Sequence, residues 1–268
     1  MNIRRTTVGL AALVMLSTWG VGAAWAAVPG NDTIRGATAI SGLPYDSTVD
    51  VSQATTDSLD ATLNLQCGAP ATQASIWYTY TAPATGVNGL VLDVSQSSYS
   101  SGVIVAEPDG LGGLRVDTCG PGTVGLQVQP GTEYKILAFN DLPGQTGGLI
   151  KLHAEAATIP SISVTVNPTG KVDRYGNALI SGTYTCSNGS FVQLETFVNQ
   201  PVGRFAVQGN GFTGSDVCDG RSHGWTSVVV PYSGKFAGGK SATFTSAFTC
   251  GNFFCNDTFV AQAVKLSR

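Results

Sequence analysis

The sequence predicts an all-β protein in which two antiparallel β-sandwich domains follow a cleaved signal peptide. Charged residues make up only 12% of the chain, while 34 glycines punctuate it. Short runs rich in β-branched and aromatic residues recur between Gly and Pro turns, at intervals of about 8–12 residues. The first domain shows no convincing 3.6-residue apolar period, so a nearly all-β protein is expected. Six cysteines, an even number, add the pattern of a disulfide-stapled extracellular protein.

The N-terminus has the three parts of a secretory signal peptide. Arg4 and Arg5 provide the positive start, and residues 8–16 form the apolar centre. Small residues precede Ala27, so we expect cleavage after Ala26. The alternative is an uncleaved membrane anchor, but a span needs about 20 predominantly apolar residues and polar residues dilute this segment. The sequence therefore predicts a secreted protein without a membrane span after cleavage.

The charge of the mature chain excludes one class of partner. Removal of residues 1–26 leaves 12 basic and 17 acidic residues, a net charge of −5. Nucleic-acid-binding domains usually carry a basic patch, so no nucleic-acid partner is expected.

A change in composition predicts a boundary between two domains. Residues 27–160 contain 4 basic and 12 acidic residues, and residues 161–268 contain 8 basic and 5 acidic residues. Ten of the eleven phenylalanines lie in the second part. We therefore expect domains at residues 27–155 and 161–268, joined by a linker at residues 156–160.

The first domain is expected to be an antiparallel sandwich with Trp77 in its core. Apolar alternation and β-rich composition predict strands at residues 75–80, 90–94, 103–105, 125–128, 134–139 and 149–153. Pro108-Asp109-Gly110 and Pro130-Gly131 supply turns, because Pro presets φ and Gly accepts a positive φ.

Several short motifs in this first domain resemble prepeptidase C-terminal-type domains of secreted bacterial proteins. The motifs are Asn31-Asp32, Ala37-Thr38-Ala39-Ile40, Ser75-Ile76-Trp77-Tyr78, Thr81-Ala82-Pro83 and Gly131-Thr132-Glu133-Tyr134. The resemblance implies a jelly-roll-like sandwich that accompanies a catalytic domain. This chain has no recognisable peptidase domain, so the resemblance does not say which enzyme the first domain would accompany.

The second domain has the strand number of an immunoglobulin-like sandwich. Seven strands are expected, at residues 162–166, 179–186, 191–198, 205–208, 226–230, 242–249 and 258–266. Residues 167–170 are expected to form a turn. An immunoglobulin domain proper carries a Trp between its two long-range cysteines, and none lies between Cys186 and Cys218. Only the architecture is therefore predicted.

Two further resemblances concern the second domain. The run Ile180-Ser181-Gly182-Thr183-Tyr184-Thr185-Cys186, with Cys218-Asp219-Gly220, His223 and Trp225, is similar to a domain of unknown function in secreted bacterial proteins. It implies no activity. The short hairpin from Cys250 to Cys255 resembles that of neocarzinostatin-type apoproteins, which implies a carrier of small apolar ligands; the spacing of the other cysteines differs.

The cysteines are expected to form disulfides rather than a metal site. Zinc sites usually take two close Cys or His pairs, and here only Cys250 and Cys255 are close. Cys67 and Cys119 have only each other within the first domain. The second domain allows three connectivities, of which Cys186–Cys218 with Cys250–Cys255 gives a strand tie and a hairpin clamp.

No catalytic, metal or cofactor site is predicted. A serine hydrolase needs a base, and only His153 and His223 are available. The sequence lacks a G-x-S-x-G elbow and an H-E-x-x-H motif. A non-catalytic binding or scaffold protein with an unknown extracellular or cell-surface ligand is thus the first hypothesis. The alternatives are an apolar-ligand carrier and an unrecognised hydrolase.

Candidate binding residues lie in two loops of the second domain: Asn252, Phe253, Phe254, His223 and Trp225. Adjacent residues in an extended segment point to opposite faces, so Phe253 and Phe254 cannot easily both be buried. An exposed Phe in a disulfide-clamped tip would suit a binding loop. The alternative is that the tip folds back onto its own domain and that Trp225 belongs to the core.

Overall fold

The computed structural model describes residues 27–69, 74–144 and 147–268. These residues form an all-β protein, apart from the helix α1 (Ser58–Cys67) and a short 3-10 turn. The predicted signal peptide, residues 1–26, lies outside the described residues. Among those described, no helix has the length and apolar character needed to cross a membrane.

The N-terminal region, residues 27–157, contains two sheets. The first has the order β1 (Thr38–Ile40), β3 (Ile76–Thr81), β8 (Glu133–Asn140), β5 (Ser101–Pro108), β6 (Leu114–Pro121). The second has the order β2 (Tyr45–Asp50), β9 (Leu149–Ala157), β4 (Gly89–Asp93), β7 (Thr123–Gln127). Tyr78 and Ile136 from the first sheet pack with Leu92 and Leu152 from the second in one apolar core. All six strands predicted for this region are present, with changed ends.

Helix α1 explains why three consecutive residues at the start of β3, Ile76, Trp77 and Tyr78, are all buried. Tyr78 faces the core between the sheets, whereas Trp77 points to the other side and packs with Leu63 of α1. Trp77 is fully buried, as the sequence predicts. This helix was not predicted from the sequence. Leu59, Leu63 and Cys67 of α1 pack in this apolar cluster at a spacing of four residues, but three apolar positions in ten residues give only a weak helical period in the sequence.

The C-terminal region, residues 161–268, forms a closed ring of strands. Their bounds are β10 (Ser161–Val166), β11 (Thr169–Val172), β12 (Ala178–Ser187), β13 (Val192–Val202), β14 (Phe205–Ser215), β15 (Asp219–Pro231), β16 (Gly239–Cys250), β17 (Cys255–Ser267). The sheet order is β10-β12-β11-β17-β16-β13-β14-β15, and an additional pairing of β12 with β15 closes the ring. Val198, Trp225 and Leu266 lie in the core.

One strand of this region replaces an expected turn. Residues 167–170 contain only a brief break after β10, because β11 begins at Thr169 and pairs in parallel with β17. Pro168 lacks an N–H, which suits the break between the two strands. The remaining seven strands were predicted, but β14, β15 and β16 are longer.

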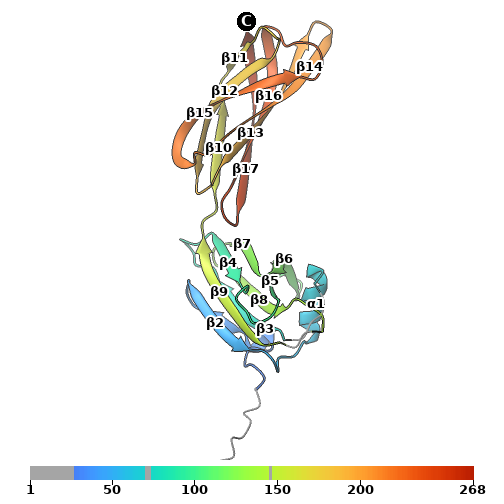
Figure 1. Cartoon of the computed structure of the whole chain (residues 1–268), viewed down its shortest axis with the longest axis vertical. Helices are drawn as coiled ribbons and strands as arrows, with labels where there is room; N and C mark the ends of the chain where they lie inside the picture. The colour runs from blue at the N-terminus through green and yellow to red at the C-terminus, as the bar shows by residue number, and fades with distance from the viewer. Residues whose placement is uncertain (1–26, 70–73, 145–146) are drawn as a thin grey trace, which may run out of the picture.

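The two regions follow one another along the long axis of the molecule (Figure 1). The chain passes from β9 to β10, and the tip between β16 and β17 points toward the N-terminal region (Figure 1). All three predicted disulfides are present: Cys67–Cys119, Cys186–Cys218 and Cys250–Cys255. Each joins two cysteines of the same region.

Candidate functional site

Trp225, one of the predicted binding residues, is a core residue. It lies on β15 and is 6% exposed, and its Nε1–H donates to the Thr165 carbonyl oxygen at 3.1 Å. Gly182 on β12 allows this approach, since a Cβ there would lie 2.9 Å from Nε1. Trp225 therefore has neither a free ring face nor a free donor for a partner.

His223 also lies on β15 and forms a pair with a carboxylate. Its Nε2 is 2.7 Å from Asp219 Oδ1, and its ring centroid is 5.5 Å from that of Tyr184. The hydrogen bond from His223 lowers the pKa of Asp219. His153 is arranged similarly, with Nδ1 2.8 Å from Asp46 Oδ1, a contact that raises the pKa of His153. Within the described residues, no serine is hydrogen-bonded to either imidazole.

Metal-binding geometry is not apparent in the described part of the chain. There, no group of three or more His, Cys, Asp or Glu side chains is placed to hold a metal ion.

The clamped tip between β16 and β17 contacts the N-terminal region. Phe254 is 8% exposed, whereas its neighbour Phe253 is 48% exposed. A Cβ at Gly89 of β4 would lie 2.9 Å from the Phe254 ring, and one at Gly125 of β7 would lie 3.2 Å from it. Two glycines therefore form a flat floor beneath Phe254.

This arrangement differs from both expectations for the tip. Phe254 is neither exposed nor folded back onto its own region, because its ring covers strands of the neighbouring region. Nothing in the local sequence around Phe254 identifies those strands as its partner. Only Phe253 and Asn252 of the tip remain exposed.

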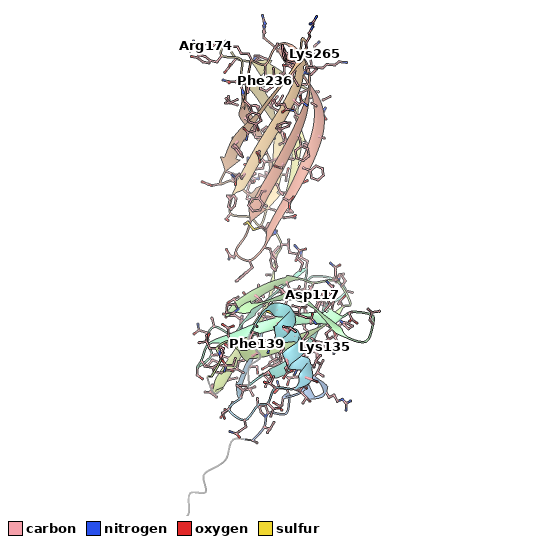
Figure 2. All side chains as sticks on the ribbon, turned by 90° about the vertical axis from the view of Figure 1, so that its right-hand side faces the viewer. Asp117, Lys135, Phe139, Arg174, Phe236 and Lys265 are labelled. Carbon is pink, nitrogen blue, oxygen red and sulfur yellow. A yellow bond between two sulfur atoms is a disulfide. The ribbon has the colours of Figure 1, made fainter. Side chains whose placement is uncertain are left out.

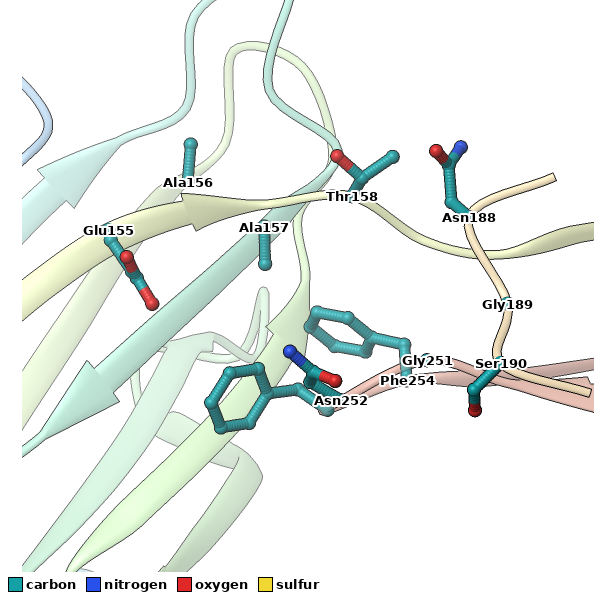
Figure 3. A pocket seen from close by; sticks show the side chains of 11 residues that line it. Glu155, Ala156, Ala157, Thr158, Asn188, Gly189, Ser190, Gly251, Asn252 and Phe254 are labelled. Atoms are coloured by element: carbon teal, nitrogen blue, oxygen red, sulfur yellow. The ribbon is translucent and has the colours of Figure 1, made fainter. Parts of the chain in front are cut away.

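A cavity of about 400 Å³ lies beside Phe254 at the junction of the regions (Figure 3). Its walls are residues 155–158, residues 188–190 and residues 251–254. Glu155 contributes the only ionisable side chain among these lining residues. The rest of the wall is small, amide or aromatic, so the cavity offers little chemistry for catalysis.

The sheet formed by β17, β16, β13 and β14 presents phenylalanines outward. We call Phe197, Phe212, Phe244, Phe248 and Phe259 the aromatic face. Phe259 and Phe212 are 67% and 59% exposed, and Phe244 and Phe248 are 45% and 38% exposed. Phe197 is half-buried between its neighbours. The signal for this site is the Phe-rich composition, but composition alone does not say which side of a strand is buried.

Strand pairing brings these rings together. Phe244 of β16 is paired with Phe197 of β13, and Phe259 of β17 is paired with Ser246 of β16. Phe212 of β14 lies in the same row as Phe259 and Ser246, and it is paired with Glu195 of β13. The Phe244 and Phe259 rings stack with centroids 5.3 Å apart and an angle of 25°. The result is a group of phenyl side chains on four strands, in which Ser246 and Glu195 separate Phe259 from Phe212.

The inward side of β16 carries hydroxyls where phenyl groups would be expected. Thr243, Thr245 and Thr249 are buried, and Phe244 and Phe248 point outward. The hydroxyl of Thr249 donates to the Phe191 carbonyl at 2.6 Å, and that of Thr243 donates to the Gln262 carbonyl at 2.8 Å. Because these buried hydroxyls have hydrogen-bond partners, the strand tolerates threonines on its buried side and phenylalanines on its exposed side. It still leaves large apolar groups in water, which marks interaction surfaces.

Comparisons with known proteins identify one part of the chain. Residues 160–250 match the model of DUF6299, a family of unknown function. This agrees with the predicted domain of unknown function and includes most of the aromatic face, but not Phe259. The sequence matches no curated protein.

Solved structures show only remote similarity. A β-glucuronidase of Parabacteroides merdae is 9% identical with a TM-score of 0.27, over 72% of this chain and 28% of that one. A DUF4785 family protein of Legionella pneumophila is 12% identical with a TM-score of 0.26, over 84% and 60%. A β-glucuronidase of Ruminococcus gnavus is 11% identical with a TM-score of 0.26, over 84% and 46%. The chain spans less than two thirds of each, and these scores carry no argument about function.

Proposed function

We propose that this is a secreted, non-catalytic binding or scaffold protein that holds a protein partner on the aromatic face. The observation that carries the proposal is the inverted pattern of β16, with threonines inside and phenylalanines outside. A strand with no binding role would gain stability from the opposite arrangement, because burial of a Phe side chain contributes about 2–3 kcal/mol.

The chemistry of the face favours a protein over a small polar ligand. Phenyl rings offer apolar area but no hydrogen-bonding group, and aromatic residues are enriched at the buried centres of protein interfaces. The face spans four strands of the C-terminal sheet. Such a surface suits a partner that is itself broad and apolar.

We further propose the two-domain organisation that the sequence predicts, with a jelly-roll-like domain followed by an immunoglobulin-like one. In support, none of the described sheets contains strands from both regions. The apolar clusters are also separate, since one set draws on residues before 155 and the other on residues after 160. An accessory role for the first domain, as its resemblance implies, remains part of this proposal.

Peptide display tests the binding function. Random peptides on phage are selected on the full mature chain, immobilised at low density, and then compared on the Phe244→Ser/Phe259→Ser variant. We expect enriched peptides rich in aromatic residues that lose binding to this variant. Val228→Ser removes an exposed apolar side chain from β15 and serves as the control. Failure to enrich peptides, or equal binding to wild type and the double variant, would contradict the proposal.

Secretion is tested independently. The three disulfides are compatible with an oxidising compartment. Mass spectrometry of protein from the culture medium is expected to give a chain that begins at Ala27. A membrane-bound chain that retains Met1 would refute this part of the proposal.

A further inference from the structure

We infer that the partner of the aromatic face is a second copy of this chain, placed antiparallel across a two-fold axis. The inference rests on the proposed function and names the occupant of the same surface. Two observations carry it: the distribution of charge along the face, and the area that the face offers.

Charged residues lie at opposite ends of the aromatic face. Lys240 of β16 and Lys265 of β17 are paired neighbours, exposed on the same side as the phenyl rings. Lys265 lies at the end of the C-terminal region remote from the N-terminal region (Figure 2). Asp257 is exposed on the same side at the other end of the face, where it is paired with Phe248, and Glu195 lies one row nearer the middle, between Ser246 and Phe212.

Two exposed residues of opposite charge lie at equal distances from Ala261 along strand β17. Asp257 precedes Ala261 by four residues, and Lys265 follows it by four residues. All three point to the same side, because side chains alternate along a strand. Ala261 is paired with Phe244, which is paired with Phe197, so the midpoint of the charges lies in the row of these two phenyl groups, and Phe259, Phe212 and Phe248 lie on the Asp257 side of it.

A two-fold axis in the interface, perpendicular to the strands, reverses the strand direction and keeps the strand order. It would therefore place β17 over β17 of the second copy. Lys265 would face Asp257 of the other chain, and the same contact would occur twice. Packed sheets are rotated by about 30°, and the long Lys side chain can span the resulting offset. A two-fold axis parallel to the strands would instead reverse the strand order and place β17 over β14, so that Lys265 and Asp257 would not meet.

The area of the face fits such an interface. Four strands spaced about 4.8 Å apart, each offering about nine residues at 3.3 Å, cover on the order of 600 Å². A standard interface buries about 800 Å² of each partner. Counted on both copies, the face offers about 1,200 Å², the lower end of specific interfaces, so we expect a weak dimer. Isologous pairing of one patch with itself is also the commonest symmetry of soluble oligomers.

Sedimentation velocity of the full mature chain over a range of concentrations tests the inference. We expect a concentration-dependent monomer–dimer equilibrium for the wild type. Phe244→Ser/Phe259→Ser is expected to remain monomeric, while Val228→Ser dimerises like the wild type. The melting temperatures of both variants confirm that they are folded.

Charge reversal tests the antiparallel register. Lys265→Glu or Asp257→Lys alone should weaken dimerisation about tenfold, since an exposed ion pair of modest strength is lost at two symmetric positions. The double variant Lys265→Glu/Asp257→Lys should restore the affinity, and an equimolar mixture of the two single variants should favour the heterodimer. Raised salt should reduce the differences among these variants.

The outcomes separate this inference from the proposed function. A wild type that stays monomeric, yet binds phage peptides through its phenyl groups, overturns the inference and leaves the proposed function standing. A further assay measures retention of the chain on insoluble polysaccharides. Retention that depends on the phenyl groups, in a chain that forms no dimers, would overturn both the inference and the proposal of a protein partner. Dimers that survive both Phe substitutions, or a double charge variant that does not recover, also overturn the inference.

Discussion

Asp60 links helix α1 to Ser75 and to Trp77 of strand β3 by side-chain hydrogen bonds. Its carboxylate accepts from the Ser75 hydroxyl at 2.6 Å and from the Trp77 Nε1–H at 2.8 Å. It also accepts from the Asp57 N–H at the start of the helix, which completes a capping box. Burial raises the pKa of Asp60 despite these bonds. One carboxyl therefore sets both the helix cap and the position of the central Trp.

The raised pKa of Asp60 predicts a pH dependence of stability. The folded state holds this proton more tightly than the unfolded chain, so its contribution to the unfolding free energy is complete below about pH 3.9. The contribution is lost as the pH rises through the folded pKa. The difference in unfolding free energy between wild type and Asp60→Asn should therefore fall across this interval, by about 1.4 kcal/mol for each unit of pKa shift.

Urea titrations at a series of pH values measure this difference. The control is Asp50→Asn, because the Ser52 N–H that donates to Asp50 lowers the pKa of that exposed carboxyl. Its pH dependence should have the opposite sign and a smaller amplitude. A difference between wild type and Asp60→Asn that is constant with pH would show that burial does not govern this group.

Strands β13 and β16 are joined within the core by a pair of hydroxyls. Thr196 Oγ1 and Thr245 Oγ1 lie 3.1 Å apart, and both residues are fully buried. The pair belongs to the same register that sends Phe197 and Phe244 outward. Core polarity and surface aromaticity are thus two aspects of one strand pairing.

This pair predicts a strongly non-additive double-mutant cycle. Thr196→Val or Thr245→Val alone leaves one buried hydroxyl without its partner, which should cost about 1–2 kcal/mol in unfolding free energy. The double Val variant removes both hydroxyls and should be close to the wild type. Chemical denaturation of the four proteins measures the coupling. For comparison, Thr196→Val with Ser241→Ala should be additive, because the Ser241 hydroxyl donates to Val264 instead.

Most strands were predictable, because alternation and turn residues are local signals. Helix α1 was missed although Asp57 and Asp60 form a local capping box, because its apolar positions are few and its contacts with Trp77 are distant in sequence. Strand β11 was missed because Pro168 and Gly170 suggest a turn, whereas pairing with distant β17 makes the segment extended.

The candidate site was less accessible to sequence reasoning. Alternation in residues 242–249 shows that Thr and Phe occupy opposite faces, but it does not say which face is buried. The usual preference would place Phe244 and Phe248 inside, and tertiary pairing reverses it. Likewise, the partner of Phe254 is two glycines more than 120 residues earlier in the chain. Neither the buried face of β16 nor the partner of Phe254 can be recognised from the neighbouring residues in the sequence.

At the scale of the whole molecule, Phe254 fixes one region against the other. The linker from β9 to β10 is one connection, and the ring on Gly89 and Gly125 is a second, distant in sequence. The Cys250–Cys255 disulfide limits the motion of the loop that carries the ring. Two connections restrict rotation about the linker, which one connection would permit.

Loss of this contact predicts independent motion of the two regions. Phe254→Ala removes the ring that covers the glycine floor, so small-angle X-ray scattering should show a broader distribution of distances than for the wild type. Thermal melting of each region should change little, because Phe254 belongs to neither apolar core. Phe253→Ala, which removes a half-exposed ring, is the matched control. Superimposable scattering curves for wild type and Phe254→Ala would show that the linker alone sets the arrangement.

The Cys250–Cys255 disulfide has a second consequence, for the alignment of the hairpin. Cys250 and Cys255 are direct partners in the β16–β17 ladder, which continues without interruption to Gly239 and Leu266. A slip by one residue would turn every side chain of a strand to the other face and would bring the phenyl groups into the core. Hydrophobicity alone would favour that slipped state. A covalent bond across the last pair excludes a slip of one strand against the other, so oxidation of these two cysteines keeps Phe244 and Phe259 on the same side of the hairpin.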